Sequence, residues 1–204
     1  LKECTFFFKA SKLTAITGAS GSGKSTLFNI IGGLDNCDSG EVLIDGENIT
    51  SLKDKNLARY RNQSLGFVFQ DHRLLPELSA RENVLLPAMI AKNSGEEIEN
   101  YMYKLLDLLK ISGLENKYPA ELSGGERQRF SVARALINSP KLVLADEPSG
   151  ALDQANANRL QDIFRELCDE LKSTIVFVTH NESLAHKSDE IWHLEQKQLL
   201  KKPR

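Results

Sequence analysis

The sequence has little excess charge, few cysteines and no long apolar run. Its 26 basic and 28 acidic residues give a net charge of −2, so there is no electrostatic footprint for nucleic acid and none is expected as a partner. The sequence has three cysteines that lie far apart: Cys4, Cys37 and Cys168. An odd number at this spacing indicates buried or incidental thiols in a reducing compartment, not a disulfide framework or a zinc site. No run approaches the roughly 20 apolar residues that cross a bilayer, and no signal-peptide pattern is present. We therefore expect any membrane part to come from another chain.

Short apolar runs alternate with helical patterns along the 204 residues. Runs that indicate buried strands, mostly in a parallel sheet, occupy residues 13–18, 65–70, 141–147 and 173–180. Residues 41–46 indicate an edge strand or hairpin, and helical patterns occupy residues 24–34, 98–109, 130–137 and 154–171. The pattern predicts an α/β core interrupted by a helical insert. In one domain of residues 1–204, we assign 1–71 and 138–204 to the core and 72–137 to a helical subdomain.

Residues 18–26, GASGSGKST, match the phosphate-loop pattern G-x-x-x-x-G-K-[ST] without a gap, between a predicted strand and a predicted helix. The glycines let successive N–H groups surround a phosphate, and the helix N-terminus adds its dipole. Lys24 can reach the β- and γ-phosphates, Ser25 can offer its hydroxyl to Mg²⁺, and Thr26 can bond the α-phosphate. The alternative is a Gly/Ser-rich loop that arises by chance. The candidate ATP-binding residues are Gly18, Ala19, Ser20, Gly21, Ser22, Gly23, Lys24, Ser25 and Thr26.

Two carboxylates, Asp146 and Glu147, end one of the predicted strands. Beside a phosphate loop, the first can hold Mg²⁺ and the second can orient and polarise the attacking water. The alternative is a solvated acidic pair. Gln70 and His180 end two further strands, and parallel strands bring their carboxyl ends to one ligand-binding crevice. The other histidines have no such context and are expected to be surface or structural residues: His72, His186 and His193.

A second helix start suited to phosphate lies at residues 122–129, LSGGERQR. Serine caps a helix well, and glycine lets backbone N–H groups approach an anion closely. An ordinary serine-capped helix would explain Ser123 but not Gly124 and Gly125, because each glycine weakens a helix by roughly 1 kcal/mol. The chain therefore carries two phosphate-facing segments about a hundred residues apart.

These segments together resemble the nucleotide-binding subunit of an ATP-binding cassette (ABC) transporter, over essentially the whole chain. The resemblance comprises a Walker A motif, GASGSGKS; a Q-loop at Gln70; a signature, LSGGERQ; a Walker B motif, LVLADE; a D-loop, SGALD, which ends at Asp153; and an H-loop at His180. In that family two cassettes pair head to tail, and each ATP lies between one subunit's Walker A and the other's signature. The resemblance implies that Ser123, Gly124 and Gly125 contact the partner's ATP, and that Asp153 belongs to the nucleotide site.

The resemblance also implies an ATPase with a P-loop NTPase core, which uses ATP and Mg²⁺. Lys24 binds the nucleotide and Glu147 is the general base, while His180 contacts the γ-phosphate. The implied magnesium residues are Ser25, Gln70 and Asp146. The implied partners are a second cassette in an ATP-dependent homodimer and integral membrane permease subunits. The implied place is the cytoplasmic side of the inner membrane, as a peripheral subunit.

The runs QDHRLLPELSARENVLLP and LADEPSGALD resemble the branch that holds lipoprotein-releasing and macrolide-exporting cassettes, and also the cell-division cassette. An ABC ATPase that signals mechanically through a membrane partner without moving cargo is the alternative. Soluble ABC ATPases of DNA repair or chromosome structure carry long heptad arms, and translation-associated ones carry two cassettes, both absent from this sequence. Four residues either line a groove for a permease's coupling helix or belong to the core of the helical insert: Leu74, Leu75, Leu78 and Val84.

In the family, an aromatic residue stacks on adenine from a segment upstream of the position of Leu1. We therefore expect this residue, and the first strand of the usual fold, to be missing from the sequence. Phe6, Phe7 and Phe8 are expected to lie on the strand that follows, and none of them is assigned the adenine contact.

Overall fold

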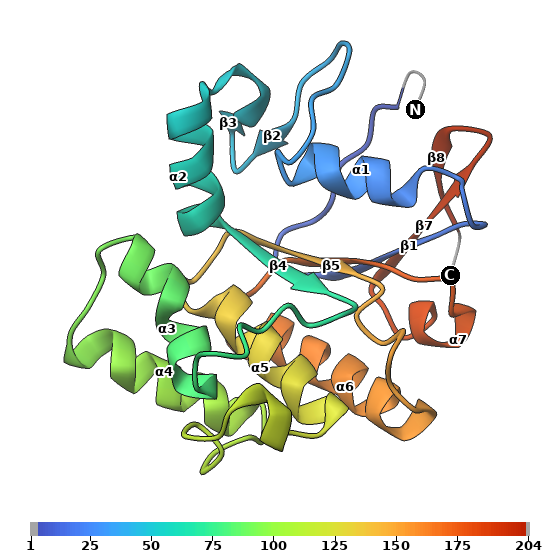
Figure 1. The fold of residues 1–204 in the computed structure, drawn as a ribbon. Helices are drawn as coiled ribbons and strands as arrows, with labels where there is room; N and C mark the ends of the chain where they lie inside the picture. Colours follow the sequence, from blue (N-terminus) through green and yellow to red (C-terminus); the bar gives the residue numbers. More distant parts are fainter. Residues whose placement is uncertain (1–3, 203–204) are drawn as a thin grey trace.

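A six-stranded sheet forms the centre of the computed structural model, which describes residues 4–202 (Figure 1). Its strands lie in the order β4, β5, β6, β1, β7, β8. All neighbouring strands are parallel except β7 and β8, which form an antiparallel edge. The strands are β1 (Leu13–Thr17), β4 (Leu65–Phe69), β5 (Leu142–Asp146), β6 (Ile175–Val178), β7 (Glu190–Glu195) and β8 (Gln198–Lys201). The predicted α/β fold with a mostly parallel sheet is confirmed.

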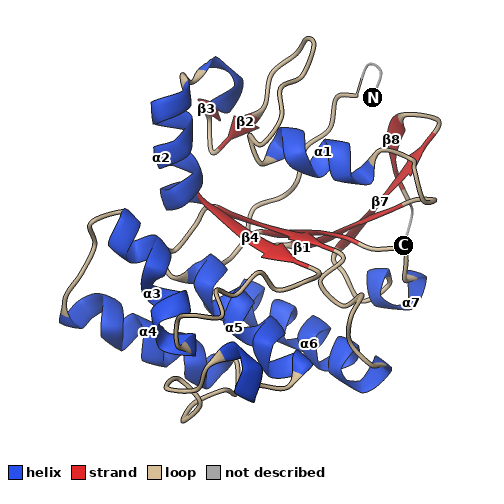
Figure 2. Ribbon diagram, viewed as in Figure 1, coloured by secondary structure: helices blue, strands red, loops and turns tan. Residues whose placement is uncertain are grey.

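Helices cover both faces of the sheet (Figure 2). One face carries α1 (Lys24–Ile31), α2 (Asp54–Ser64), the short helix η1 (Ile49–Ser51) and the hairpin of β2 (Leu43–Ile44) and β3 (Glu47–Asn48). The other carries α3 (Ala80–Ile90), α4 (Glu96–Leu108), α5 (Gly124–Leu136), α6 (Gln154–Glu170) and the short helix η2 (Pro119–Glu121), and α7 (Glu182–Ala185) follows β6. No helix within residues 4–202 is long and apolar enough to cross a membrane.

Strand β5 shows why a continuous apolar run forms a central strand. Leu142 and Leu144 belong to the apolar cluster that contains Phe28 of α1. Val143 and Ala145 point the other way, into the cluster shared with α5 and α6. Because successive side chains alternate between two covered faces, all four of these strand positions are buried.

Helix α5 packs directly on β4 at a glycine. A Cβ atom at Gly66 would lie 2.4 Å from the carbonyl oxygen of Ala135, so this approach requires a residue without a side chain. The apolar cluster on this face contains residues of α3, α4 and α5 together with residues of the sheet. The division into a core of residues 1–71 and 138–204 and a helical subdomain of residues 72–137 therefore stays a prediction.

The expected strand at Phe6–Phe8 is wrong. The structure has no regular secondary structure there, and Phe6 and Phe8 each pack against Trp192 with ring centroids 6.2 Å apart. Aromatic packing thus orders this segment without a ladder of backbone hydrogen bonds. The expectation about the adenine-stacking aromatic concerns positions upstream of Leu1 and lies outside the described residues.

Candidate functional site

Four parallel strands end in one row, and the segments that follow them carry most of the predicted site residues. Phe69 pairs with Asp146, which in turn pairs with Val178. Val178 also pairs with Ile16. Just beyond this row, β4 leads into Gln70 and β5 into Glu147. In the same way β6 leads into His180 and β1 into Gly18. The tertiary structure thus brings together residues that are up to 162 positions apart in the chain.

The loop between β1 and α1 is shaped by glycines and by a lysine. Gly18 has a φ of +153°, and a Cβ atom there would lie 2.6 Å from the carbonyl oxygen of Leu194. Gly23, the N-cap of α1, has a φ of +103°, which favours glycine. The Lys24 ammonium donates hydrogen bonds of 2.9 Å to the carbonyl oxygens of Gly18 and Ala19. The lysine side chain therefore lies back over the loop.

The first turn of α1 offers unpaired hydrogen-bond donors. Among residues 4–202, no acceptor contacts the backbone N–H groups of Lys24, Ser25 and Thr26. Gly23 has no side chain that could cap them. Unpaired N–H groups and the positive end of the helix dipole attract a phosphate group. The donors, the lysine and the exposed hydroxyl groups of Ser25 and Thr26 are therefore suited to a polyphosphate.

Two carboxylates lie at the end of β5. The pKa of the Asp146 carboxyl is raised because burial disfavours its charged form and because Glu147 adds a like charge. Lys24 and Arg73 oppose this shift in pKa. Lys24 of the phosphate loop is thus close enough to act on the charge at the end of β5.

Glu147 carries a buried oxygen atom that lacks a hydrogen-bond donor. Its Oε2 atom lies 3.0 Å from Nδ1 of His180, but the contact lacks hydrogen-bond geometry and no other described group donates to this oxygen. A buried acceptor without a donor costs roughly 1–3 kcal/mol, which suits a position that holds a water molecule. The His180 side chain is 73% exposed, so it lies at the open side of the carboxylate.

The predicted magnesium residues fit an ion that takes few ligands from the protein. Within residues 4–202, no three His, Cys, Asp or Glu side chains cluster as a metal site would require. Mg²⁺ commonly takes one or two carboxylates, completed by waters and by phosphate oxygens of the substrate. Asp146 and the Ser25 hydroxyl supply ligands of this kind. A Cβ atom at Gly150 would lie 2.8 Å from Nε2 of Gln70, so the Gln70 side chain lies against the loop that follows Glu147.

The second phosphate-suited segment lies on the face of the sheet opposite α1 (Figure 1). Ser123 caps α5: its Oγ atom accepts the Glu126 N–H at 3.3 Å, and its own N–H donates to Oε2 of Glu126 at 2.7 Å. A Cβ atom at Gly125 would lie 3.1 Å from Oδ1 of Asn156, in the first turn of the helix that Asp153 caps. The structure thus groups the signature with Asp153, and it separates this group from the α1 face.

The remaining predicted residues take different positions. His72 is buried, Nδ1 of His193 lies 2.9 Å from Oγ1 of Thr17, and His186 ends α7. Val84 is buried in the main apolar cluster, whereas Leu75 is 42% exposed. The groove for a coupling helix stays a prediction.

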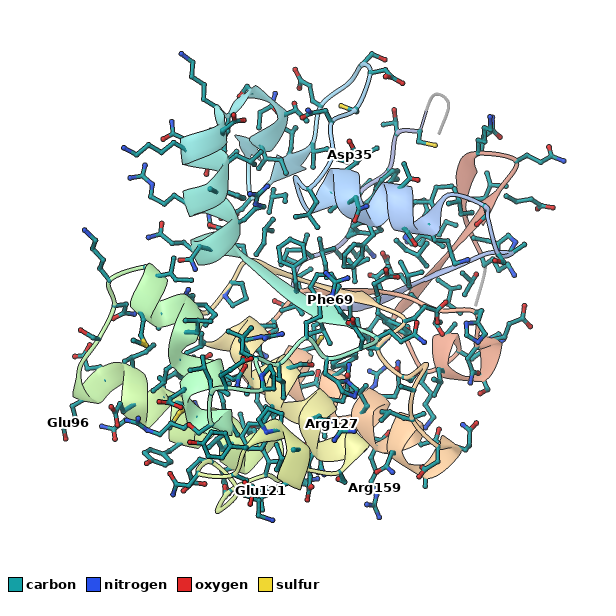
Figure 3. All side chains as sticks on the ribbon, viewed as in Figure 1. Asp35, Phe69, Glu96, Glu121, Arg127 and Arg159 are labelled. Carbon is teal, nitrogen blue, oxygen red and sulfur yellow. The ribbon has the colours of Figure 1, made fainter. Side chains whose placement is uncertain are left out.

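Sequence reasoning did not identify two side chains that lie near the site, those of Arg73 and Gln128. The guanidinium carbon of Arg73 lies 4.0 Å from the centroid of the Phe69 ring, and Nε2 of the buried Gln128 donates to the Phe69 carbonyl at 3.4 Å. Figure 3 labels Phe69 at the end of β4 and Arg127 in the first turns of α5 below it. The only signal for Gln128 was its place within LSGGERQR. Sequence spacing could not reveal a contact with a residue 59 positions away.

Comparisons with known proteins give a consistent result. A family model described as ABC transporter matches residues 1–150. The lipoprotein-releasing system ATP-binding protein LolD of Cytophaga hutchinsonii is 51% identical over 192 residues, which cover 93% of this chain and 86% of that protein. The protein of the same name from Treponema denticola is 48% identical over 187 residues, which cover 92% of this chain and 83% of that protein.

Solved structures are also similar. The dimeric structure of MJ0796, a bacterial ABC transporter cassette, has a TM-score of 0.84 at 38% identity. The alignment covers 95% of this chain and 85% of that chain. A dimeric post-hydrolysis state of MJ0796 bound to ADP and Pi has a TM-score of 0.84 at 36% identity, with the same coverage.

Proposed function

Because this chain belongs to the ABC transporter family as an ATP-hydrolysing, ATP-binding subunit, we propose that it drives an integral membrane permease in a lipoprotein-releasing system. It acts as a peripheral subunit on the cytoplasmic side of the inner membrane. The observation that carries the ATPase part is the row of parallel strand ends, which collects the phosphate loop and two carboxylates at one edge. The cargo class is supported by the names of relatives 48–51% identical to this chain.

ATP binds with its phosphates on the loop between β1 and α1. The unpaired N–H groups of the first turn of α1 donate to phosphate oxygens. Lys24 exchanges its contacts with the loop carbonyls for the β- and γ-phosphates. This exchange stabilises the nucleotide because an ammonium group interacts more strongly with an anion than with a neutral carbonyl.

The carboxylates at the end of β5 divide the remaining work. Asp146, Ser25 and Gln70 would hold Mg²⁺, which would supply neutralisation of the developing phosphate charge. Glu147 orients the attacking water with its buried Oε2 atom and takes its proton as general base. His180, 3.0 Å from that atom, contacts the γ-phosphate.

Two copies of the chain pair head to tail with ATP between them. Ser123, Gly124, Gly125 and Asp153 lie away from the α1 face of their own chain, so a partner's phosphate loop provides the nucleotide that they contact. The dimeric cassette structures of MJ0796 support such a pair. Each ATP is then contacted by two chains.

Reconstitution tests the proposal. The chain is co-purified with the membrane proteins encoded beside its gene and placed in liposomes that contain a lipoprotein. We expect ATP-dependent release of the lipoprotein into the soluble fraction, and no release with the Lys24→Ala chain as the matched control. ATP hydrolysis stimulated by the membrane partner without any release would favour a mechanical signal over transport. ATP hydrolysis without association with a membrane protein would favour a soluble ABC ATPase.

A further inference from the structure

A buried glutamine of the signature helix contacts the backbone just before Gln70 and a side chain just after it. Gln128 is 0% exposed. Its Nε2 donates to the carbonyl oxygen of Phe69 at 3.4 Å, and its Oε1 accepts from Nδ1 of His72. An amide oxygen can only accept, so Nδ1 of His72 carries the proton. Gln128 therefore contacts the residue just before Gln70 and the residue two positions after it.

A second side chain of the same helix holds the same segment. Arg134 donates to the carbonyl oxygens of His72, at 2.8 Å, and of Arg73. His72 and Arg73 have φ values of +60° and +49°, a region that residues other than glycine adopt infrequently. The pKa of Arg134 is lowered, first by burial and then by the charge of Arg73. Helix α5 thus holds a tight left-handed bend of the backbone next to Gln70.

The far end of the segment is held by α3. The Asn83 side chain is completely buried. It accepts the N–H of Leu75 at 2.7 Å and donates to the carbonyl oxygens of Leu75, Leu78 and Ser79, each at 3.0 Å. Residues 69–79 are therefore attached to α3 and α5 by buried side chains, whereas the Gln70 side chain lies against Gly150 at the end of the β5 loop.

We propose that Gln128 is a positioning residue for Gln70, through which helix α5 connects the signature to the magnesium side of the chain's own ATP site. The inference rests on the proposed function, because it requires that Gln70 help to hold Mg²⁺. When α5 moves with Ser123 and Gly125, Gln128 carries the Phe69 carbonyl and the His72 side chain along. It so sets the distance of the Gln70 amide from the end of β5. Gln128 itself does not contact the nucleotide.

A double-mutant cycle with a matched control tests this. Gln128→Met keeps the length of the side chain and removes both contacts. Gln161→Met is the control: Gln161 is a buried glutamine on α6 whose Nε2 has no partner among the described residues. Both changes are made with and without Gln70→Ala, and urea unfolding monitors the fold. The readouts are kcat and KM for ATP, and the affinity for Mn²⁺, measured by electron paramagnetic resonance with a non-hydrolysable ATP analogue bound.

We expect Gln128→Met to lower kcat and Mn²⁺ affinity about 10-fold, because loss of a residue that orients a metal ligand typically costs 10–100-fold. The affinity for the ATP analogue measured without metal should change little. In the Gln70→Ala background the same change should have no further effect. Gln161→Met should leave all readouts unchanged. If Gln128→Met does not fold, Gln128→Glu, which keeps the acceptor for His72 but loses the donor to Phe69, should show the same pattern.

Two results would overturn this inference and leave the proposed function standing. One is a Gln128 variant with unchanged kcat and Mn²⁺ affinity while Gln70→Ala loses both. The other is that Gln128→Met lowers kcat and Mn²⁺ affinity by the same factor with and without Gln70→Ala. If Gln70→Ala itself changes neither readout, the magnesium role of Gln70 in the proposed function is wrong, and the inference fails with it.

Discussion

Mixing two inactive variants should restore ATPase activity if the signature serves the partner's nucleotide. The first variant is Lys24→Ala, which lacks the ammonium of the phosphate loop. The second is Gly125→Asp, which places a carboxylate at the start of α5. In either homodimer both ATP sites carry a lesion. In a head-to-tail mixed dimer both lesions fall in one site, and the other site consists entirely of wild-type residues.

The expected magnitudes follow from the geometry. A Cβ atom at position 125 would lie 3.1 Å from Oδ1 of Asn156, so the Asn156 side chain must shift slightly to accept any side chain there. At a distance of about 4 Å and an effective dielectric constant near 20, two unit charges repel by about 4 kcal/mol, which is about 10³-fold in affinity. Random pairing makes about half of the dimers mixed, each with one intact site, so about a quarter of the wild-type activity should return.

The assay is steady-state phosphate release from each protein alone and from equal mixtures, with subunit exchange verified by tagged chains. The matched control mixes Lys24→Ala with Glu147→Gln. Lys24 and Glu147 belong to the same ATP site of their own chain, one in the first turn of α1 and the other after β5. In a mixed dimer each site therefore keeps one lesion, and no activity should return. Two facts must be verified separately: that Lys24→Ala and Gly125→Asp form mixed dimers, and that a dimer with one intact site is active. If both hold and mixing restores no activity, the signature does not act in trans.

Three further predictions concern single residues. Lys24→Ala should abolish ATP binding or turnover while circular dichroism shows an intact fold, and wild-type turnover would contradict the role of the ammonium. Glu147→Gln should bind ATP but hydrolyse it roughly 10² to 10⁴-fold more slowly, since the amide cannot take a proton; it should form a dimer with MgATP, and size-exclusion chromatography that shows only monomer would count against this. Gly66→Ala should lower the free energy of unfolding in urea by about 1–3 kcal/mol, because the new methyl group would lie 2.4 Å from the Ala135 carbonyl oxygen; an unchanged midpoint would show that α5 can move away freely.

The local motifs were predictable because each is one continuous stretch whose chemistry depends on its own spacing. The phosphate loop places its glycines and Lys24 within nine residues, and β5 is a continuous apolar run because both of its faces are covered. Helix α2 (Asp54–Ser64) was missed because Tyr60 is its only buried residue, so it lacks the apolar stripe that predicts a helix. Strands β7 and β8 were missed as well, since the short polar segment at their turn interrupts the apolar pattern.

The sequence alone thus determined the family, the phosphate loop, the acidic strand end and the presence of a second phosphate-suited helix start. Only the tertiary structure decided which of these lie together. Strand register placed Phe69 beside Asp146, so that Gln70 and Glu147 leave the sheet at the same edge. The two faces of the sheet separated the signature from α1. Packing of α5 on the sheet placed Gln128 against Phe69 and His72. Contacts of this kind depend on how helices pack on a sheet, which is set by buried surfaces distant in the chain and not by the spacing within any one motif.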